Sequence, residues 1–215
     1  MMPAPIMTKS AAENSIAAPS DDGLGQALAR VQACRLCVGE LPQPPRPVLR
    51  VKPGTRILII GQAPGTRAHA SGLPFDDPSG ERLRAWLGIG RETFYGHPGL
   101  SMMPMAFCFP GLDARGGDRP PPRRCAPAWH PVIRPLLPEL SLTLLVGQYA
   151  QARYLAGRRR ASLTATVAAW RDHGPALMPL PHPSWRNNRW LAMHPWFEAE
   201  TLPALRARVS ALLGG

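Results

Sequence analysis

A short aliphatic run places the strongest constraint on the fold of this chain. Residues 56–60 read Arg-Ile-Leu-Ile-Ile, and the turn-forming sequence Gly-Gln-Ala-Pro-Gly follows at residues 61–65. Four consecutive large aliphatic residues leave a strand without a polar face, which is typical of strands buried on both sides in a parallel sheet. In such sheets the ligand lies beyond the carboxyl ends of the strands. We therefore expect residues 61–65 to lie in the active-site crevice.

Strand and helix patterns alternate along the rest of the chain. They predict three more strands, at residues 102–109, 142–146 and 176–180. They predict helices at residues 23–34, 79–87, 127–137, 148–155, 163–170 and 196–213, with Ser79 as the N-cap of the second. Alternating strands and helices build a parallel sheet that is covered on both faces. We predict an α/β fold, a three-layer α/β/α sandwich around a central, mainly parallel four-stranded sheet.

The chain has room for one domain of ordinary size. Its 215 residues, 45% of them hydrophobic, can fill a single core, and we place that domain at residues 23–215. Residues 1–22 lack periodicity and are predicted to be a flexible leader without the basic and apolar regions of a secretory signal. No apolar run approaches the roughly 20 residues that a membrane-spanning helix needs. We expect a cytoplasmic protein that does not enter a membrane.

The charge balance predicts a polyanionic partner. The 25 basic residues outnumber the 14 acidic residues, which gives a net charge of +11, and Lys9 and Lys52 are the only lysines. Arginine suits bidentate binding of phosphates and stacking on bases, so the simplest partner is nucleic acid. The alternative is a GC-rich coding bias that raises Arg, Ala and Pro together, which the 27 prolines would fit.

Four cysteines form a candidate metal site. Cys34 and Cys37 are two residues apart in a Cys-x-x-Cys pattern, and 16 residues separate Cys108 from Cys125. In a reducing compartment disulfides are disfavoured, so clustered thiols indicate a metal. Four thiolates suit either a tetrahedral zinc ion or a [4Fe–4S] cluster, and the spacing leaves both open. Alternatively, Cys108 is a small buried side chain in an apolar segment.

A histidine follows the last predicted strand. His182 opens the sequence His-Pro-Ser, where an imidazole can donate a hydrogen bond to a leaving group at the mouth of the sheet. The next loop reads Trp-Arg-Asn-Asn-Arg at residues 185–189. Aromatic and basic side chains of this kind can enter a duplex or stack on a base. The alternative is a solvated turn with Trp185 packed inward.

Two further candidates follow the loop at residues 61–65. Phe75 is either a stacking platform for a base or a buried aromatic residue. Asp77 can orient a water molecule or cap the following helix. The loop itself can approach a phosphate or make a tight turn. Because it carries neither a Walker motif nor Gly-x-Gly-x-x-Gly, we expect no nucleotide cofactor.

At these residues the chain resembles the uracil-DNA glycosylase superfamily, and most of all its iron–sulfur-containing family 4 branch. The corresponding stretches, in the family's order, are residues 61–65, 72–75 with Ser79 and Gly80, 108–125 and 182–184. The resemblance covers roughly residues 30–210. It implies a uracil-DNA glycosylase-like fold and a DNA-repair hydrolase. Such an enzyme flips uracil, or a related deaminated base, out of DNA and hydrolyses its N-glycosidic bond.

The resemblance also implies roles for individual residues. His182 would hydrogen-bond the pyrimidine oxygen that gains negative charge, and Phe75 would stack on the base. The other substrate-binding residues would be Gly61, Ala63, Pro64, Gly65 and Ser184. The DNA-binding residues would be Trp185, Arg186, Asn187 and Arg189. A structural [4Fe–4S] cluster would be held by Cys34, Cys37, Cys108 and Cys125. We expect a monomer, as is common among DNA glycosylases.

Three positions depart from the family's pattern. Gln62 stands where family 4 has Glu, and Ala63 stands where family 1 has a water-orienting Asp. Asp77, in Asp-Pro-Ser-Gly, resembles the aspartate of family 5, so it is the preferred water-positioning residue beside Gln62 in the predicted catalytic set. Residues 103–107 contain no asparagine to read the edge of uracil. The alternative function is a catalytically weak or inactive nucleic-acid-binding relative that keeps the pocket and the metal site.

Overall fold

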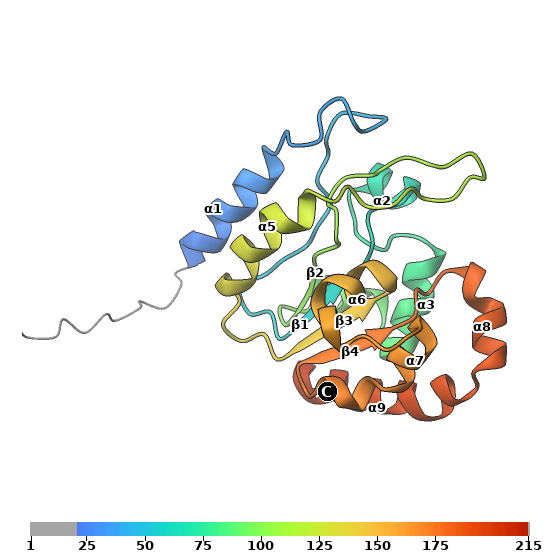
Figure 1. Ribbon diagram of the computed structural model, residues 1–215. Coiled ribbons are helices and arrows are strands. Elements are labelled where there is room, and N and C mark those ends of the chain that lie inside the picture. Colours follow the sequence, from blue (N-terminus) through green and yellow to red (C-terminus); the bar gives the residue numbers. More distant parts are fainter. Residues whose placement is uncertain (1–20, 215) are drawn as a thin grey trace, which may run out of the picture.

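Four parallel strands form the centre of the molecule (Figure 1). The structure is a computed structural model and describes residues 21–214. The strands are β1 (Ile57–Ile60), β2 (Leu100–Met102), β3 (Leu142–Val146) and β4 (Leu177–Leu180). Their order is β2-β1-β3-β4, so β1 pairs with both β2 and β3. The predicted parallel sheet of four strands is confirmed.

Helices cover both faces of this sheet. They are α1 (Asp21–Gln32), α2 (Thr66–Ser71), α3 (Pro78–Leu87), α4 (Arg91–Gly96), α5 (Cys125–Ile133), α6 (Gln148–Leu155), α7 (Leu163–Ala168), α8 (Asn188–Met193) and α9 (Leu202–Leu213). Between residues 21 and 214, no helix is both long and apolar enough to cross a membrane. The predicted leader, residues 1–22, lies outside the described residues except for its last two, with which α1 begins.

The core is divided into two layers by the alternation of side chains along β1. Ile57 and Ile59 pack against α3, α4, α7 and α9, and Leu58 and Ile60 pack against α1, α5 and α6. Successive side chains of a strand point to opposite faces, so the aliphatic run supplies both layers at once. On the second face α1 and α5 lie side by side (Figure 1). The three-layer sandwich is therefore confirmed.

The segment at residues 102–109 differs from its predicted strand. Strand β2 ends at Met102, and the rest of the segment is mostly buried without being a strand. Its backbone turns to the loop after β1, because Met105 N donates to Gly61 O at 2.9 Å and Ala106 N donates to Gln62 O at 3.0 Å. Pro104 has no N–H to continue the ladder. The apolar run therefore supports the site loop rather than extending the sheet.

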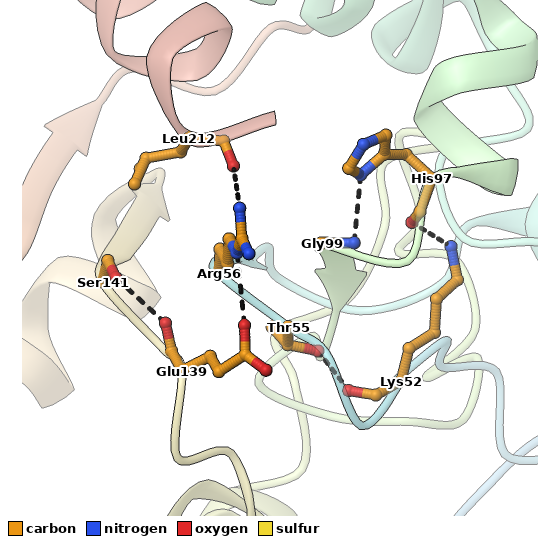
Figure 2. A network of polar contacts seen from close by, with 8 residues as sticks. All are labelled: Lys52, Thr55, Arg56, His97, Gly99, Glu139, Ser141 and Leu212. Atoms are coloured by element: carbon orange, nitrogen blue, oxygen red, sulfur yellow. Dashed lines mark hydrogen bonds and ion pairs between the residues drawn. The ribbon is translucent and has the colours of Figure 1, made fainter. Parts of the chain in front are cut away.

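A network of polar contacts closes the amino edge of the sheet (Figure 2). Lys52 Nζ donates to the carbonyl of His97 at 2.5 Å, which ties the segment before β1 to the segment before β2. Arg56 Nε lies 3.2 Å from Glu139 Oε2, and its guanidinium also reaches the carbonyl of Leu212 at the end of α9. These contacts lie at the edge opposite the loops that follow the strands.

Candidate active site

A cavity of about 280 Å³ opens at the carboxyl edge of the sheet. It is formed by the loops after β1, β2 and β4 together with the start of α3. Residues predicted for the site that line it are Gly61, Gln62, Ala63, Pro64, Gly65, Phe75, Asp77, His182, Ser184, Arg186 and Asn187. Residues that sequence reasoning missed are Val48, Ala68, Pro74, Ser79, Pro104 and Asp118. The structure thus brings residues that are far apart in the sequence, from Val48 to Asn187, around one cavity.

Phe75 is held as a wall of this cavity by a strained backbone. Its φ is 58°, in the left-handed region that costs a residue with a side chain about 1–3 kcal/mol. Two glycines make room for it: a Cβ on Gly61 would lie 2.8 Å from Phe75 Cζ, and a Cβ on Gly80 would lie 1.7 Å from its carbonyl oxygen. Tyr95 Oη also donates to the carbonyl of Pro74 at 2.9 Å. The surroundings therefore fix the ring against the loop after β1.

His182 presents a neutral ring to the cavity. Its Nδ1 accepts a hydrogen bond from the backbone N–H of Ser184 at 3.2 Å, which places the proton of the neutral ring on Nε2. Burial lowers the pKa of His182, and the nearby Asp77 carboxylate opposes this shift. The side-chain amide of Asn187 donates to the carbonyl of His182 at 2.6 Å and holds the loop. His182 is therefore a hydrogen-bond donor that stays uncharged near neutral pH.

Asp77 has a structural task as well as a place in the cavity. Its Oδ1 accepts a hydrogen bond from Gly80 N at 2.8 Å, so it is the N-cap of α3. The prediction that Ser79 caps this helix is wrong, because the helix begins one residue earlier, at Pro78. Asp77 also lines the cavity, where its charge acts on His182 and Asp118. Both interpretations of this residue therefore agree with its position.

Gln62 and Asp118 line the same cavity from two different loops. Gln62 Nε2 donates to the carbonyl of Arg119 at 3.3 Å, and thereby ties the loop after β1 to the long loop that leads to α5. Asp118 lies on that loop, and a Cβ on Gly65 would lie 3.5 Å from its Oδ2. Burial and the charge of Asp77 raise the pKa of Asp118. No strand or helix pattern marks this position, which is why sequence reasoning missed it.

The loop after His182 carries an outward-facing aromatic side chain. Trp185 is 70% exposed, so the interpretation in which it packs inward is wrong. The guanidinium carbon of Arg186 lies 5.4 Å from the centroid of its ring, a cation–π distance. Arg82 donates to the carbonyl of Ser184 at 3.1 Å and anchors the loop to α3. Arg189, on α8, is exposed and lies outside the cavity lining.

The four cysteines line a second, apolar cavity. They come from the segment after α1, the segment after β2 and the start of α5. The cavity is lined by Cys34, Leu36, Cys37, Pro45, Pro47, Ala106, Phe107, Cys108, Pro122, Cys125 and Trp129. Burial raises the pKa of Cys108 to about 11 and that of Cys125 to about 12. Thiols in such a setting ionise only with a positive partner, such as a metal centre.

The four thiols line one shared cavity. Within residues 21–214, no group of three or more Cys, His, Asp or Glu side chains is arranged to hold a single metal ion. A zinc ion would need every sulfur at about 2.3 Å from one centre. In a [4Fe–4S] cluster each thiolate binds a different iron, so the sulfurs stand around a cavity. Four thiols in apolar surroundings are a donor set that fits a [4Fe–4S] cluster.

Comparison with known families agrees with the fold and with the cavity. The family model described as the uracil DNA glycosylase superfamily matches residues 50–206. The matched range contains all four strands and every residue of the cavity lining except Val48. It leaves out Cys34 and Cys37, so it identifies the superfamily and not the iron–sulfur branch. With this match over most of its length, the chain belongs to the uracil DNA glycosylase superfamily, whose members are glycosylase-type hydrolases acting on DNA.

Proposed function

We propose that this protein excises uracil, or a related deaminated base, from DNA by hydrolysing the N-glycosidic bond. The observation that carries the proposal is the pairing of Phe75 and His182 in one cavity. Phe75 offers an aromatic face to a base, and His182 offers a neutral N–H donor. A base can reach such a cavity only after it leaves the stack, which costs a few kcal/mol and least at mismatches.

The chemistry depends on charge that develops on the departing base. When the glycosidic bond breaks, its electron pair goes to the base, and a pyrimidine oxygen becomes negative. The Nε2–H of His182 would stabilise that oxygen in a site with little water, where such a hydrogen bond is strong. The sugar passes through an oxocarbenium-like state, which the carboxylate of Asp77 would stabilise. Water then adds to the anomeric carbon and leaves an abasic site.

DNA would be held by the loop at residues 185–189 and by the arginine excess. The exposed ring of Trp185 can fill the space that a flipped nucleotide leaves, as apolar wedges do between base steps. Arg186 and Arg189 lie on either side of Asn187 and Asn188 and can bind phosphates. A net charge of +11 would make this binding fall steeply with salt.

A [4Fe–4S] cluster is the second part of the proposal. Cys34, Cys37, Cys108 and Cys125 would hold it, and its positive irons would keep the buried thiols ionised. Its role would be structural, because it would join α1, α5 and the segment after β2. The test is the absorption of the purified protein near about 400 nm together with its iron, sulfide and zinc content. Four irons per chain support the cluster, whereas one zinc and no iron contradict it.

One observation favours a second candidate function, a DNA-binding relative without activity. Gln62 has no carboxylate and its amide is engaged by Arg119, while Asp77 is engaged in capping α3. Such a protein would bind a flipped base in the same cavity and release nothing.

A base-release assay separates the two functions. Single- and double-stranded oligonucleotides with uracil, hypoxanthine or xanthine are incubated with the full chain, and alkali converts abasic sites into strand breaks. Breaks at uracil support the proposal as stated. Breaks only at another base would keep the reaction and change the substrate. Selective binding without breaks, even with one protein per oligonucleotide, would support the inactive relative.

A further inference from the structure

We propose that Asp118 is a catalytic residue that holds the attacking water and takes its proton, and that Gln62 is the residue that positions it. This inference rests on the proposed glycosylase function. It concerns a side chain at the mouth of the cavity, on a loop far in sequence from the 61–65 and 182–184 stretches.

The Asp118 carboxylate lies against the loop after β1. A Cβ on Gly65 would be 3.5 Å from its Oδ2 and 3.7 Å from its Oδ1. Asp118 lines the same cavity as Phe75 and His182. When a base lies on Phe75, its sugar must remain toward the mouth, because the backbone of the DNA stays outside. Asp118 is therefore placed beside the path by which water reaches the sugar.

Among the described residues, Asp118 is the carboxylate of this cavity lining that has no hydrogen-bond or ion-pair partner. Within the described range 21–214, its side chain makes no hydrogen bond or ion pair. Asp77, the other acid of the lining, accepts the capping hydrogen bond from Gly80. Nearby Asp76 is paired with Arg91 at 2.8 Å. A carboxylate that must bind water needs free oxygens, and Asp118 has them.

The loop that carries Asp118 is held in a defined shape. Leu112 and Asp118 form an antiparallel bridge, and Arg119 N donates to the carbonyl of Gly111 at 2.9 Å. Asp113 closes the turn, because its Oδ1 accepts from two backbone N–H groups at 2.8 Å. A defined loop is what a positioned base requires.

Gln62 fixes this loop to the loop after β1. Its amide donates to the carbonyl of Arg119, directly after Asp118. A glutamate at this position could not donate that hydrogen bond and would bring a further negative charge beside Asp118. Gln62 thus holds the loop that carries Asp118, and Asp118 supplies the carboxylate that Gln62 lacks.

The step balances without any further reactant. The C1′–N1 bond breaks and its electron pair leaves with the base, whose oxygen His182 stabilises. The oxygen of water bonds to C1′, and its proton passes to Asp118. The acid then returns that proton to solvent or to the departing anion. The products are the free base and an abasic site.

The pH dependence of base release supports a test. Three charged groups act on Asp118: Asp77 at the start of α3, Asp113 on its own loop and Arg186 on the loop after β4. Burial and the two aspartates raise its pKa, and Arg186 opposes them. As the pH is lowered, the rate of base release should therefore begin to fall at a higher pH than it would if an ordinary aspartate were the base.

The experiment measures single-turnover uracil release by Asp118→Asn, with Asp172→Asn as the matched control. Asp172 pairs with Arg160 and precedes β4, at the other edge of the sheet. We expect Asp118→Asn to lower the rate by about 100-fold or more and to remove the acidic limb of the pH profile. Its affinity for an oligonucleotide with non-hydrolysable 2′-fluoro-deoxyuridine should equal that of the wild type. Asp118→Glu, which keeps a carboxylate, should recover part of the rate.

Two results would overturn the assignment. One is a rate for Asp118→Asn within a few-fold of wild type, and the other is a loss of analogue affinity as large as the loss of rate. Gln62→Glu should shift the acidic limb of the profile, which a purely structural glutamine would not do. A wild-type protein that releases no base contradicts both this assignment and the proposed function, whereas an active Asp118→Asn contradicts the assignment alone.

Discussion

The ring of Phe75 lies directly over the α-carbon of Gly61, so close that a Cβ on the glycine would be 2.8 Å from Phe75 Cζ. The position of the Phe75 ring therefore requires a glycine at residue 61. A side chain at Gly61 would displace the ring, which forms a wall of the cavity.

Gly61→Ala should weaken base recognition more than folding. The added methyl group overpacks the site, which typically costs about 1–3 kcal/mol, because the ring of Phe75 also packs edge-on against Phe94. We expect the KM for uracil-containing DNA to rise by about tenfold. Steady-state kinetics beside Gly90→Ala, where a methyl group meets nothing within 4 Å, would test this. An unchanged KM would contradict the stacking role of Phe75.

Trp185→Ala should affect duplex substrates and leave single strands almost unaffected. The side chain is 70% exposed, so its removal should not change the melting temperature. If it fills the gap left by the flipped base, its loss costs about 1–3 kcal/mol of stacking and lowers duplex excision by about tenfold. Met193→Ala, at a residue that is 63% exposed on α8, is the matched control. Equal losses on both kinds of DNA would contradict the wedge.

His130 should make the protein sensitive to acid. It is buried in α5, where its ring hydrogen-bonds to Tyr154 and to the carbonyl of Pro104, and burial lowers its pKa to about 4 from 6.5. Between these pH values the unfolded chain binds the proton and the folded chain does not. The stabilisation is therefore complete above pH 6.5 and is lost as the pH falls toward 4, by on the order of 3 kcal/mol.

Urea unfolding at several pH values tests this prediction. His130→Gln keeps hydrogen-bonding groups but does not titrate, so its stability should depend less steeply on pH than that of the wild type. Parallel curves for the two proteins would contradict the assignment of the acid sensitivity to His130.

The sheet and the main walls of the cavity could be predicted from the sequence, because each has a recognisable local pattern of residues. The run at residues 57–60 is aliphatic on both faces and must be a buried strand, and His182 and Phe75 lie in recognisable motifs next to predicted elements. Residues 103–109 misled the prediction because burial alone does not distinguish a strand from a loop. Their backbone partners lie in the loop at residues 61–62, which only the folded chain reveals.

Asp118 shows the limit of that reasoning. It lies in a Gly-Gly-Asp stretch without periodicity, between a bridge partner at Leu112 and the tether from Gln62. Its role becomes visible only in the folded chain, where Gln62 contacts Arg119, 57 positions away in sequence, and Asp118 lies beside Gly65. The helices α2, α4 and α8, of six residues each, were also missed.

The most direct test of the central claim is the single-turnover rate of uracil release by wild type and by His182→Ala, at neutral pH and on single-stranded DNA. His97→Asn, at the opposite edge of the sheet (Figure 2), is the control. If the Nε2–H of His182 stabilises the departing base, its loss should lower the rate by about 100- to 1,000-fold, with the control unchanged. A His182→Ala variant that releases uracil at the wild-type rate would contradict the account.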